Sequence, residues 1–127
     1  MGNQILWVGI GGFVGANARY ALGRLFAGRV GDGFPLATLL VNLSGSFAIG
    51  VVLTLLTERW VADPAWRLLI VVGFLGGYTT FSSYTFEALL LVETGHWARA
   101  IWYVLASNVL GLAAAFAGML LARAVGH

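Results

Sequence analysis

The sequence contains no cysteine and no lysine, and it has few charged residues of any kind. Only 9% of its 127 residues are charged, against roughly 25% in soluble domains, and the mean hydropathy is +0.89. This composition excludes an ordinary soluble domain. The absence of cysteine excludes disulfides, thiolate metal sites and cysteine nucleophiles. The net charge of +2 is scattered along the chain, so we expect no nucleic-acid partner.

Four long apolar runs take up nearly the whole chain. A helix needs about 20 mostly apolar residues to cross a bilayer, and the runs predict spans at about 4–26, 36–57, 67–94 and 98–122. No basic residue precedes the first run, so we expect it to be retained rather than cleaved as a secretory signal. The connections are short, so neighbouring spans run antiparallel. We therefore expect an all-α integral membrane protein in the lipid bilayer, with a single membrane domain over 1–127.

Tryptophan and arginine mark the ends of these spans. The tryptophans fall close to the expected span ends, where the amphipathic ring prefers the headgroup level: Trp7, Trp60, Trp66, Trp97 and Trp102. The arginines divide almost evenly, with Arg19, Arg24, Arg29 and Arg99 toward one end and Arg59, Arg67 and Arg123 at the other. The positive-inside rule needs an imbalance to choose a direction. The chain is therefore either oriented by a single arginine or inserted both ways, in which case opposite copies could form an antiparallel dimer.

Polar residues recur on one face of the second and fourth spans. Thr38, Asn42 and Ser46 follow one another at helical spacing, as do Tyr103 and Ser107. Ordinary helix packing explains any one of these residues. Together they favour a shared aqueous or ion-coordinating path, because an interhelical hydrogen bond in a membrane contributes only about 0.6 kcal/mol on average and hardly requires so many.

Residues 73–86, GFLGGYTTFSSYTF, place two adjacent glycines and seven hydroxyl groups in the middle of the third span. Each unpaired polar group in hydrocarbon costs a few kcal/mol, so this stretch must face something other than lipid. Gly76, Gly77 and the threonines that follow are poor helix formers, which predicts a break in the helix. The backbone carbonyls that a break frees can be satisfied by threonine hydroxyls or by a small bound cation, and both alternatives are open.

Aromatic residues follow the expected break. Phe81 and Tyr84 share one helix face, and the positive edges of their rings can favour an anion, while hydroxyls such as that of Ser82 can donate to it. Glu87 opposes this interpretation, because a carboxylate is costly near the bilayer centre and repels anions; we expect it in a wet vestibule. Residue chemistry alone thus indicates a small ion channel or exporter without naming the ion.

Three segments resemble those of the Fluc/CrcB fluoride channels: GGFVGANARY (11–20), ATLLVNLSGSFAIG (37–50) and GFLGGYTTFSSYTF (73–86). Length, the four spans and the charge balance agree with the family across essentially the whole chain. The resemblance implies a dual-topology antiparallel homodimer with two fluoride pores and a broken third helix. Such a protein exports fluoride passively across the cell membrane of a microbe and relieves fluoride toxicity.

The family's functional residues carry over onto matching positions. With Ser82 from the donor argument, the expected fluoride pore is lined by Thr38, Asn42, Phe81, Ser82, Tyr84, Tyr103 and Ser107. Arg19 would lie near an aqueous vestibule. The backbone carbonyls of Gly76 and Thr79 would hold a structural sodium ion on the dimer axis. One departure stands out: the family pattern TTFSTF reads TTFSSY here, so the second ring is Tyr84, whose phenol can also donate a hydrogen bond.

Two other classes fit parts of the sequence. A small multidrug exporter has similar length and span number, but such proteins resemble one another in a membrane-embedded glutamate in the first span, and this first span has none. A helical assembly subunit without transport leaves the hydroxyl run unexplained. An enzyme is not expected, because His96 and His127 lie in a loop and at the tail, away from any nucleophile.

Overall fold

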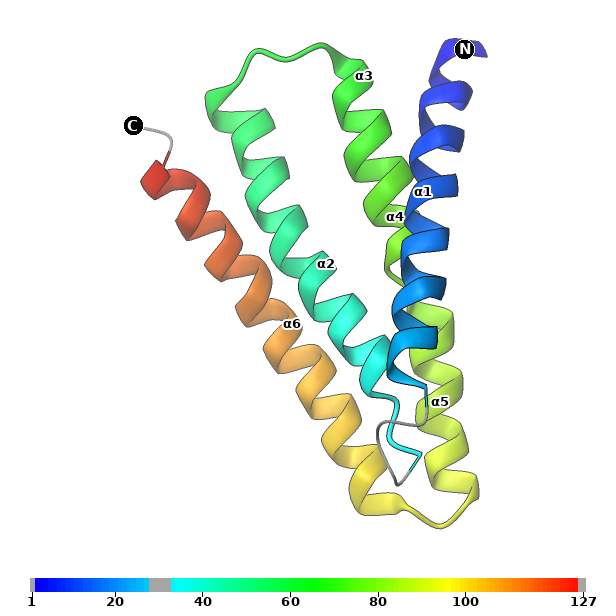
Figure 1. Ribbon diagram of the computed structural model, residues 1–127. Helices are drawn as coiled ribbons and strands as arrows, with labels where there is room; N and C mark the ends of the chain where they lie inside the picture. Colours follow the sequence, from blue (N-terminus) through cyan, green and yellow to red (C-terminus); the bar gives the residue numbers. More distant parts are fainter. Residues whose placement is uncertain (1, 28–32, 126–127) are drawn as a thin grey trace.

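The computed structural model describes residues 2–27 and 33–125, and every regular element within them is helical (Figure 1). The longer helices are α1 (Gly2–Phe26), α2 (Leu36–Thr54), α5 (Phe81–Glu93) and α6 (Trp97–Val125). The shorter segments are η1 (Leu55–Arg59), α3 (Pro64–Trp66), η2 (Arg67–Leu75) and α4 (Gly76–Tyr78), where η denotes a π-helical stretch. Asp63 is the N-cap of α3: its side chain accepts a hydrogen bond from the Ala65 amide, and Pro64 occupies the first helical position.

Three stretches within the described residues are long and apolar enough to cross a membrane: Leu36–Arg59, Pro64–Glu93 and Trp97–Val125. The protein is therefore a multi-pass membrane protein. The first expected span, α1, is a continuous helix of 25 residues. It is not among the three, and glycines, Asn17 and Arg19 lower its apolar content.

Small residues decide how the helices pack in pairs. Figure 1 shows α1 lying along η2 and α4, and α2 lying along α6. A Cβ atom added at Gly11 of α1 would collide with the carbonyl oxygen of Leu69 in η2, and one added at Gly118 of α6 would collide with that of Phe47 in α2. The backbones thus approach more closely than any larger residue would permit.

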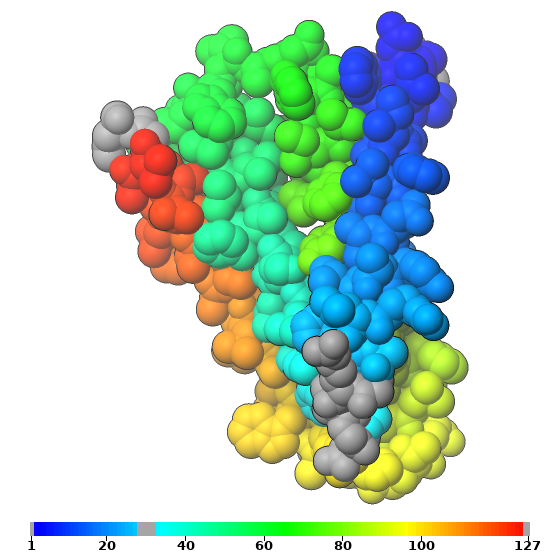
Figure 2. All heavy atoms as spheres, viewed as in Figure 1, coloured from blue at the N-terminus to red at the C-terminus, as the bar shows by residue number. Residues whose placement is uncertain are grey.

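The helices described form four rods, which in chain order are α1, α2 with η1, α3 to α5, and α6. These rods form an open arrangement rather than a closed bundle. In Figure 2, the C-terminal half of α6 (orange to red) and α1 (blue) lie at opposite edges of the visible face, with α2 between them. The cluster of buried side chains gathers where α2, α5 and α6 meet: Leu39, Leu91, Ala100 and Tyr103. Many large apolar side chains elsewhere are exposed, as expected for surfaces that face lipid.

The third rod is broken at two threonines. Thr79 (φ −86°, ψ 157°) and Thr80 (φ −150°, ψ 118°) are extended between α4 and α5. The sequence predicted a break in this stretch from the glycine pair and the threonines that follow; the threonines are extended, whereas Gly76 and Gly77 are themselves helical. The Gly77 position instead serves packing, because an added Cβ would lie 2.9 Å from the carbonyl oxygen of Gly12 in α1. Gly77 therefore permits close approach to α1, and the threonines carry the extended backbone.

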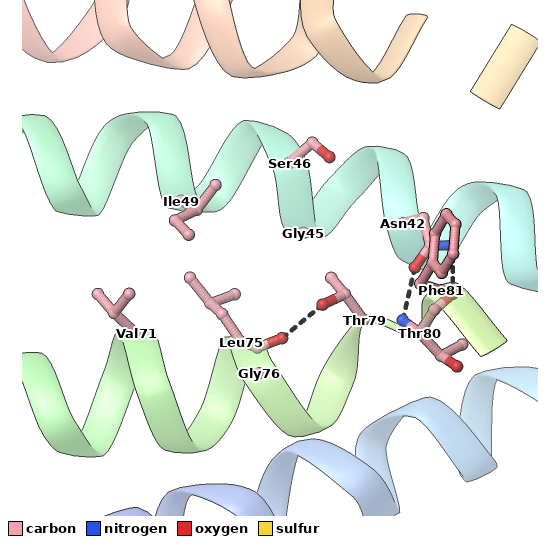
Figure 3. Close-up of a pocket in the computed structure, with 10 residues that line it drawn as sticks. All are labelled: Asn42, Gly45, Ser46, Ile49, Val71, Leu75, Gly76, Thr79, Thr80 and Phe81. Atoms are coloured by element: carbon pink, nitrogen blue, oxygen red, sulfur yellow. Dashed lines mark hydrogen bonds between the residues drawn. The ribbon is translucent and has the colours of Figure 1, made fainter. Parts of the chain in front are cut away.

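The side chain of Asn42 holds the broken segment in place (Figure 3). Its Oδ1 accepts from the Thr80 amide at 2.8 Å, and its Nδ2 donates to the Thr80 carbonyl at 2.9 Å. One carboxamide thus satisfies both backbone groups of an extended residue, as a neighbouring strand would. The Thr80 hydroxyl then caps α5 by accepting from the Ser83 amide at 3.2 Å. We call this pairing of Asn42 with Thr80 the Asn42 clamp.

Arginines lie at both ends of the molecule. Arg59, Arg67 and Arg123 lie at the end of the molecule that holds α3, whereas Arg24 and Arg99 lie toward the opposite end. Arg29, which the sequence placed at the same end as Arg24 and Arg99, lies outside the described residues. At the first end, the carboxylate of Glu58 accepts two hydrogen bonds from Arg123, at 2.8 and 3.1 Å, which ties η1 to α6.

Removing the Asn42 clamp should weaken the fold at the break. Asn42→Ala leaves the N–H and C=O of Thr80 unpaired at membrane depth, each at a cost of about 1–3 kcal/mol. We expect a lower midpoint of thermal unfolding in detergent and faster deuterium exchange of the Thr80 amide. Asn42→Asp places a second acceptor against the Thr80 carbonyl oxygen and a carboxylate at membrane depth, so it should destabilise at least as much, and Ser46→Ala on the same helix is the matched control. Unchanged protection of the Thr80 amide in Asn42→Ala would show that the clamp does not hold the break.

Candidate functional site

A crevice of about 370 Å³ opens between α2 and the broken rod (Figure 3). Its lining combines apolar and polar groups: Asn42, Gly45, Ser46, Ile49, Val71, Leu75, Gly76, Thr79, Thr80 and Phe81. Gly45 permits the approach of α2 to the break, because an added Cβ would collide with the methyl group of Thr79. Phe81 lines the same crevice as Asn42 and is 75% exposed. The crevice thus brings four residues of the expected pore and sodium site to one place.

The hydrogen bonds at the break leave two backbone carbonyls without a donor. Both the amide and the hydroxyl of Thr79 donate to the Leu75 carbonyl, at 3.0 and 2.8 Å. The Thr80 amide, which would donate to Gly76 in a continuous helix, goes to Asn42 instead. Within residues 2–27 and 33–125, no donor contacts the carbonyl of Gly76 or of Thr79. These are the two carbonyls expected to bind sodium, and oxygen ligands of this kind suit that ion.

A row of aromatic rings runs from the exposed crevice into the buried core. Phe81 and Tyr84 have centroids 5.7 Å apart, Tyr84 and Tyr103 5.3 Å, and Tyr103 and Phe34 5.5 Å. The last two pairs are edge-to-face, which presents positive ring edges to the neighbouring groups. Tyr103, the third ring of the row, is fully buried. The two rings that the sequence placed on one helix face are therefore part of a longer row that crosses to α6.

Glu87 accepts from two of the expected pore hydroxyls. The Thr38 hydroxyl donates to its Oε1 at 2.7 Å and the Tyr103 hydroxyl to its Oε2 at 3.4 Å. Glu87 is half-buried and lines a cavity of about 530 Å³ that extends to Thr94 and His96 at the end of the molecule. This position fits the vestibule expected from the sequence. The contacts themselves join three helices, so spacing along the chain could not reveal them.

The fourth rod places two more polar residues beside the aromatic row. Asn108 Nδ2 donates to the Tyr84 hydroxyl at 3.0 Å and to the Val104 carbonyl at 2.8 Å. Ser107 Oγ is buried and has no hydrogen-bond partner in the described part of the chain. The sequence pattern named Ser107 as a pore residue. It did not single out Asn108, whose partner becomes visible only once α5 and α6 are packed.

Arg19 and Ser82 lie on either side of the break. Arg19 Nε donates to the Gly77 carbonyl at 3.1 Å, so the guanidinium ties α1 to α4. It also lines a second crevice, of about 280 Å³, with Thr38, Thr80 and Ser83 among its other walls. Ser82 is exposed at the start of α5, with its Oγ 3.3 Å from the Thr80 hydroxyl. Arg19 therefore lies beside a hollow, as a vestibule residue would.

Comparison with known proteins agrees with these features. The family model described as CrcB-like protein, Camphor Resistance (CrcB), matches residues 6–119. The chain is similar to a protein of Koribacter versatilis named Fluoride-specific ion channel FluC, with 48% identity over 96% of this chain and 97% of the relative. Proteins of the same name from Solibacter usitatus and a Roseiflexus species are 52% and 50% identical, each over 94% of this chain and 98% and 97% of the relatives. The chain therefore belongs to the CrcB family.

Proposed function

We propose that this protein is a fluoride-selective ion channel that exports fluoride passively across a prokaryotic plasma or inner membrane and relieves fluoride toxicity. The observation that carries the proposal is the near-full-length identity of about half to relatives named fluoride-specific ion channels. The site supports it, because hydroxyl and amide donors lie beside ring edges and the chain contains no lysine. Donors without strong positive charge suit a small, strongly hydrated anion that must also leave.

The fluoride route follows the aromatic row. Phe81 and Tyr84 present their edges to the ion, and Ser82, Tyr103 and Ser107 contribute hydroxyls along the way. Asn42 lines the route where it meets the crevice, but both ends of its carboxamide already bind Thr80. Its main contribution is therefore to hold the break open beside the ion rather than to coordinate the ion with its full donor strength.

Glu87 competes with fluoride for hydroxyl donors along this route. Its carboxylate takes the hydrogen bonds of Thr38 and Tyr103, which are donors that fluoride would otherwise use. An anion that reaches these hydroxyls must compete with the carboxylate, and the two negative groups repel each other. We place Glu87 at the vestibular end of the route, where the cavity toward His96 admits water that screens the charge.

A second, antiparallel copy completes the site and gives two pores. The solvent-accessible surface of the single chain is 8015 Å², whereas that of a compact monomer of the same mass would be about 6,500 Å². The excess surface is available for contact with a second copy. The crevice along α2 opens sideways with Asn42, Ser46 and Thr79 in its wall, and polar groups of this kind do not face lipid. α1 runs the length of η2 and α4 and serves as the fourth span of each copy.

A sodium ion fits between the two copies. Each chain would offer the carbonyls of Gly76 and Thr79, which have no donor among the described residues. Two oxygens are few for a cation, and a second copy related by a two-fold axis doubles them. The ion would join the two broken rods and neutralise the partial charge of their carbonyls.

Fluoride efflux from liposomes tests the proposed function. Purified protein in liposomes should release fluoride, measured with a fluoride-selective electrode, once an ionophore shunts potassium. Chloride release should be much slower, because weaker hydration suits it less well to a path built from hydroxyl donors. Equal chloride efflux, or proton-coupled efflux of a lipophilic cation, would contradict the assignment.

Labelling of single cysteines tests the antiparallel arrangement. Because the chain has no native cysteine, Ala62→Cys and Glu93→Cys each provide one thiol, at opposite ends of the molecule. Each should react with an impermeant maleimide from both sides of the membrane, since the arginines give no direction. Adding Arg67→Gln to either variant unbalances the ends and should shift the labelling toward one side. Labelling of the balanced chain from one side alone would rule out dual topology.

A further inference from the structure

The direction of the hydrogen bond between Asn108 and Tyr84 follows from a third group. Asn108 Nδ2 contacts the Val104 carbonyl oxygen, which can only accept. This contact requires the amide nitrogen, not the amide oxygen, at that position. The second hydrogen of the same nitrogen points to Tyr84, 3.0 Å away. The phenol oxygen of Tyr84 is therefore the acceptor in this pair.

The Tyr84 hydroxyl consequently keeps its own hydrogen for another acceptor. A phenol has a single O–H to donate, and within residues 2–27 and 33–125 no acceptor contacts it. The half-buried ring is fixed between Phe81 and Tyr103. Ring packing and Asn108 together thus set the direction of a donor that lacks a partner inside the membrane, where an unused donor is costly.

A second unused donor lies nearby. Ser107 Oγ is buried and contacts no hydrogen-bond partner in the part of the chain that the structure describes. Ser107 directly precedes Asn108 on α6 and follows Tyr103 by one turn, and the Tyr103 ring packs edge-to-face with Tyr84. Two hydroxyl hydrogens without acceptors therefore occur where α5 meets α6, beside positive ring edges. A small anion is the ligand whose chemistry satisfies both kinds of group.

We propose that Asn108 is a positioning residue that directs the Tyr84 hydroxyl toward the permeating ion, so that Tyr84 binds fluoride through its O–H group. A phenylalanine at this position would offer only a ring edge. The proposal rests on the proposed fluoride channel and deepens it. Because a hydroxyl hydrogen bonds more strongly to a small, concentrated charge, the O–H group adds preference for fluoride over larger halides.

The half-saturating fluoride concentration for flux through liposomes tests the proposal. Tyr84→Phe removes only the hydroxyl and keeps the ring, and Asn108→Ala removes the group that directs it. Each should raise the half-saturating concentration at least about tenfold, the factor that corresponds to ~1.4 kcal/mol, close to the lower end of the range for hydrogen bonds to charged groups. The double variant should shift no further than either single variant, because Asn108 acts only through the hydroxyl.

Two matched variants control for packing. Like Asn108, Asn17 donates its Nδ2 hydrogen to the carbonyl oxygen four residues earlier, that of Phe13, at 2.7 Å. Among the described residues it contacts no phenol. The Tyr78 hydroxyl pairs with Ser44 instead of an amide. Asn17→Ala and Tyr78→Phe should therefore keep the wild-type half-saturating concentration, and all variants should elute like the wild type in size-exclusion chromatography.

The outcomes separate this proposal from the channel assignment. A wild-type protein that carries no fluoride overturns both. A wild-type protein that carries fluoride, with an unchanged half-saturating concentration in Tyr84→Phe, overturns the role of the hydroxyl alone. A further shift when Asn108→Ala is added to Tyr84→Phe would show that Asn108 acts by itself, so the positioning role is wrong. Should Asn108→Ala not fold, Tyr84→Phe alone decides whether the hydroxyl binds the ion.

Discussion

The structure depends on one carboxamide paired with one backbone unit. An extended segment in the middle of a membrane needs partners for its N–H and C=O groups, and lipid provides none. Asn42 supplies both partners to Thr80. Because the Thr80 amide turns to Asn42, it leaves the Gly76 carbonyl without its helical donor, and the Thr80 side chain becomes free to cap α5. The direction of α5, and with it the position of the Phe81 ring, follows from this pairing.

The polar groups near the break divide into those that already have a hydrogen-bond partner and those that have none among the described residues. Asn42 forms hydrogen bonds with Thr80, and the Thr79 hydroxyl donates to the Leu75 carbonyl. The Thr38 and Tyr103 hydroxyls donate to Glu87. Four groups have no partner among the described residues: the carbonyls of Gly76 and Thr79, the Ser107 hydroxyl and the hydrogen of the Tyr84 phenol. The leftover carbonyls suit a cation, whereas the leftover hydroxyls suit an anion. These opposite preferences support separate sodium and fluoride sites within one small protein.

The all-helical membrane architecture could be predicted from residue patterns, because long apolar runs and the faces that residues share depend on local periodicity. The break was predicted within the right stretch, and Phe81 and Tyr84 do lie ring beside ring. The partners of Asn42, Glu87 and Asn108 could not be predicted, since each lies on another helix and depends on how the rods pack. Within that stretch, Gly77 is helical and packs closely against Gly12 of α1, a role that its residue type alone could not distinguish from backbone freedom. The second copy, the sodium ion and the pore roles remain predictions.

The central claim is that fluoride passes the ring edges beside the clamped break. Fluoride flux through Phe81→Ile tests it most directly, with Phe86→Ile as control, because both phenylalanines are exposed on α5 but only Phe81 lines the crevice. Isoleucine keeps an apolar side chain and removes the positive ring edge. The account predicts that Phe81→Ile loses most of its flux while its size-exclusion profile is unchanged, and that Phe86→Ile conducts normally. Normal flux through Phe81→Ile would show that the ion does not pass this ring.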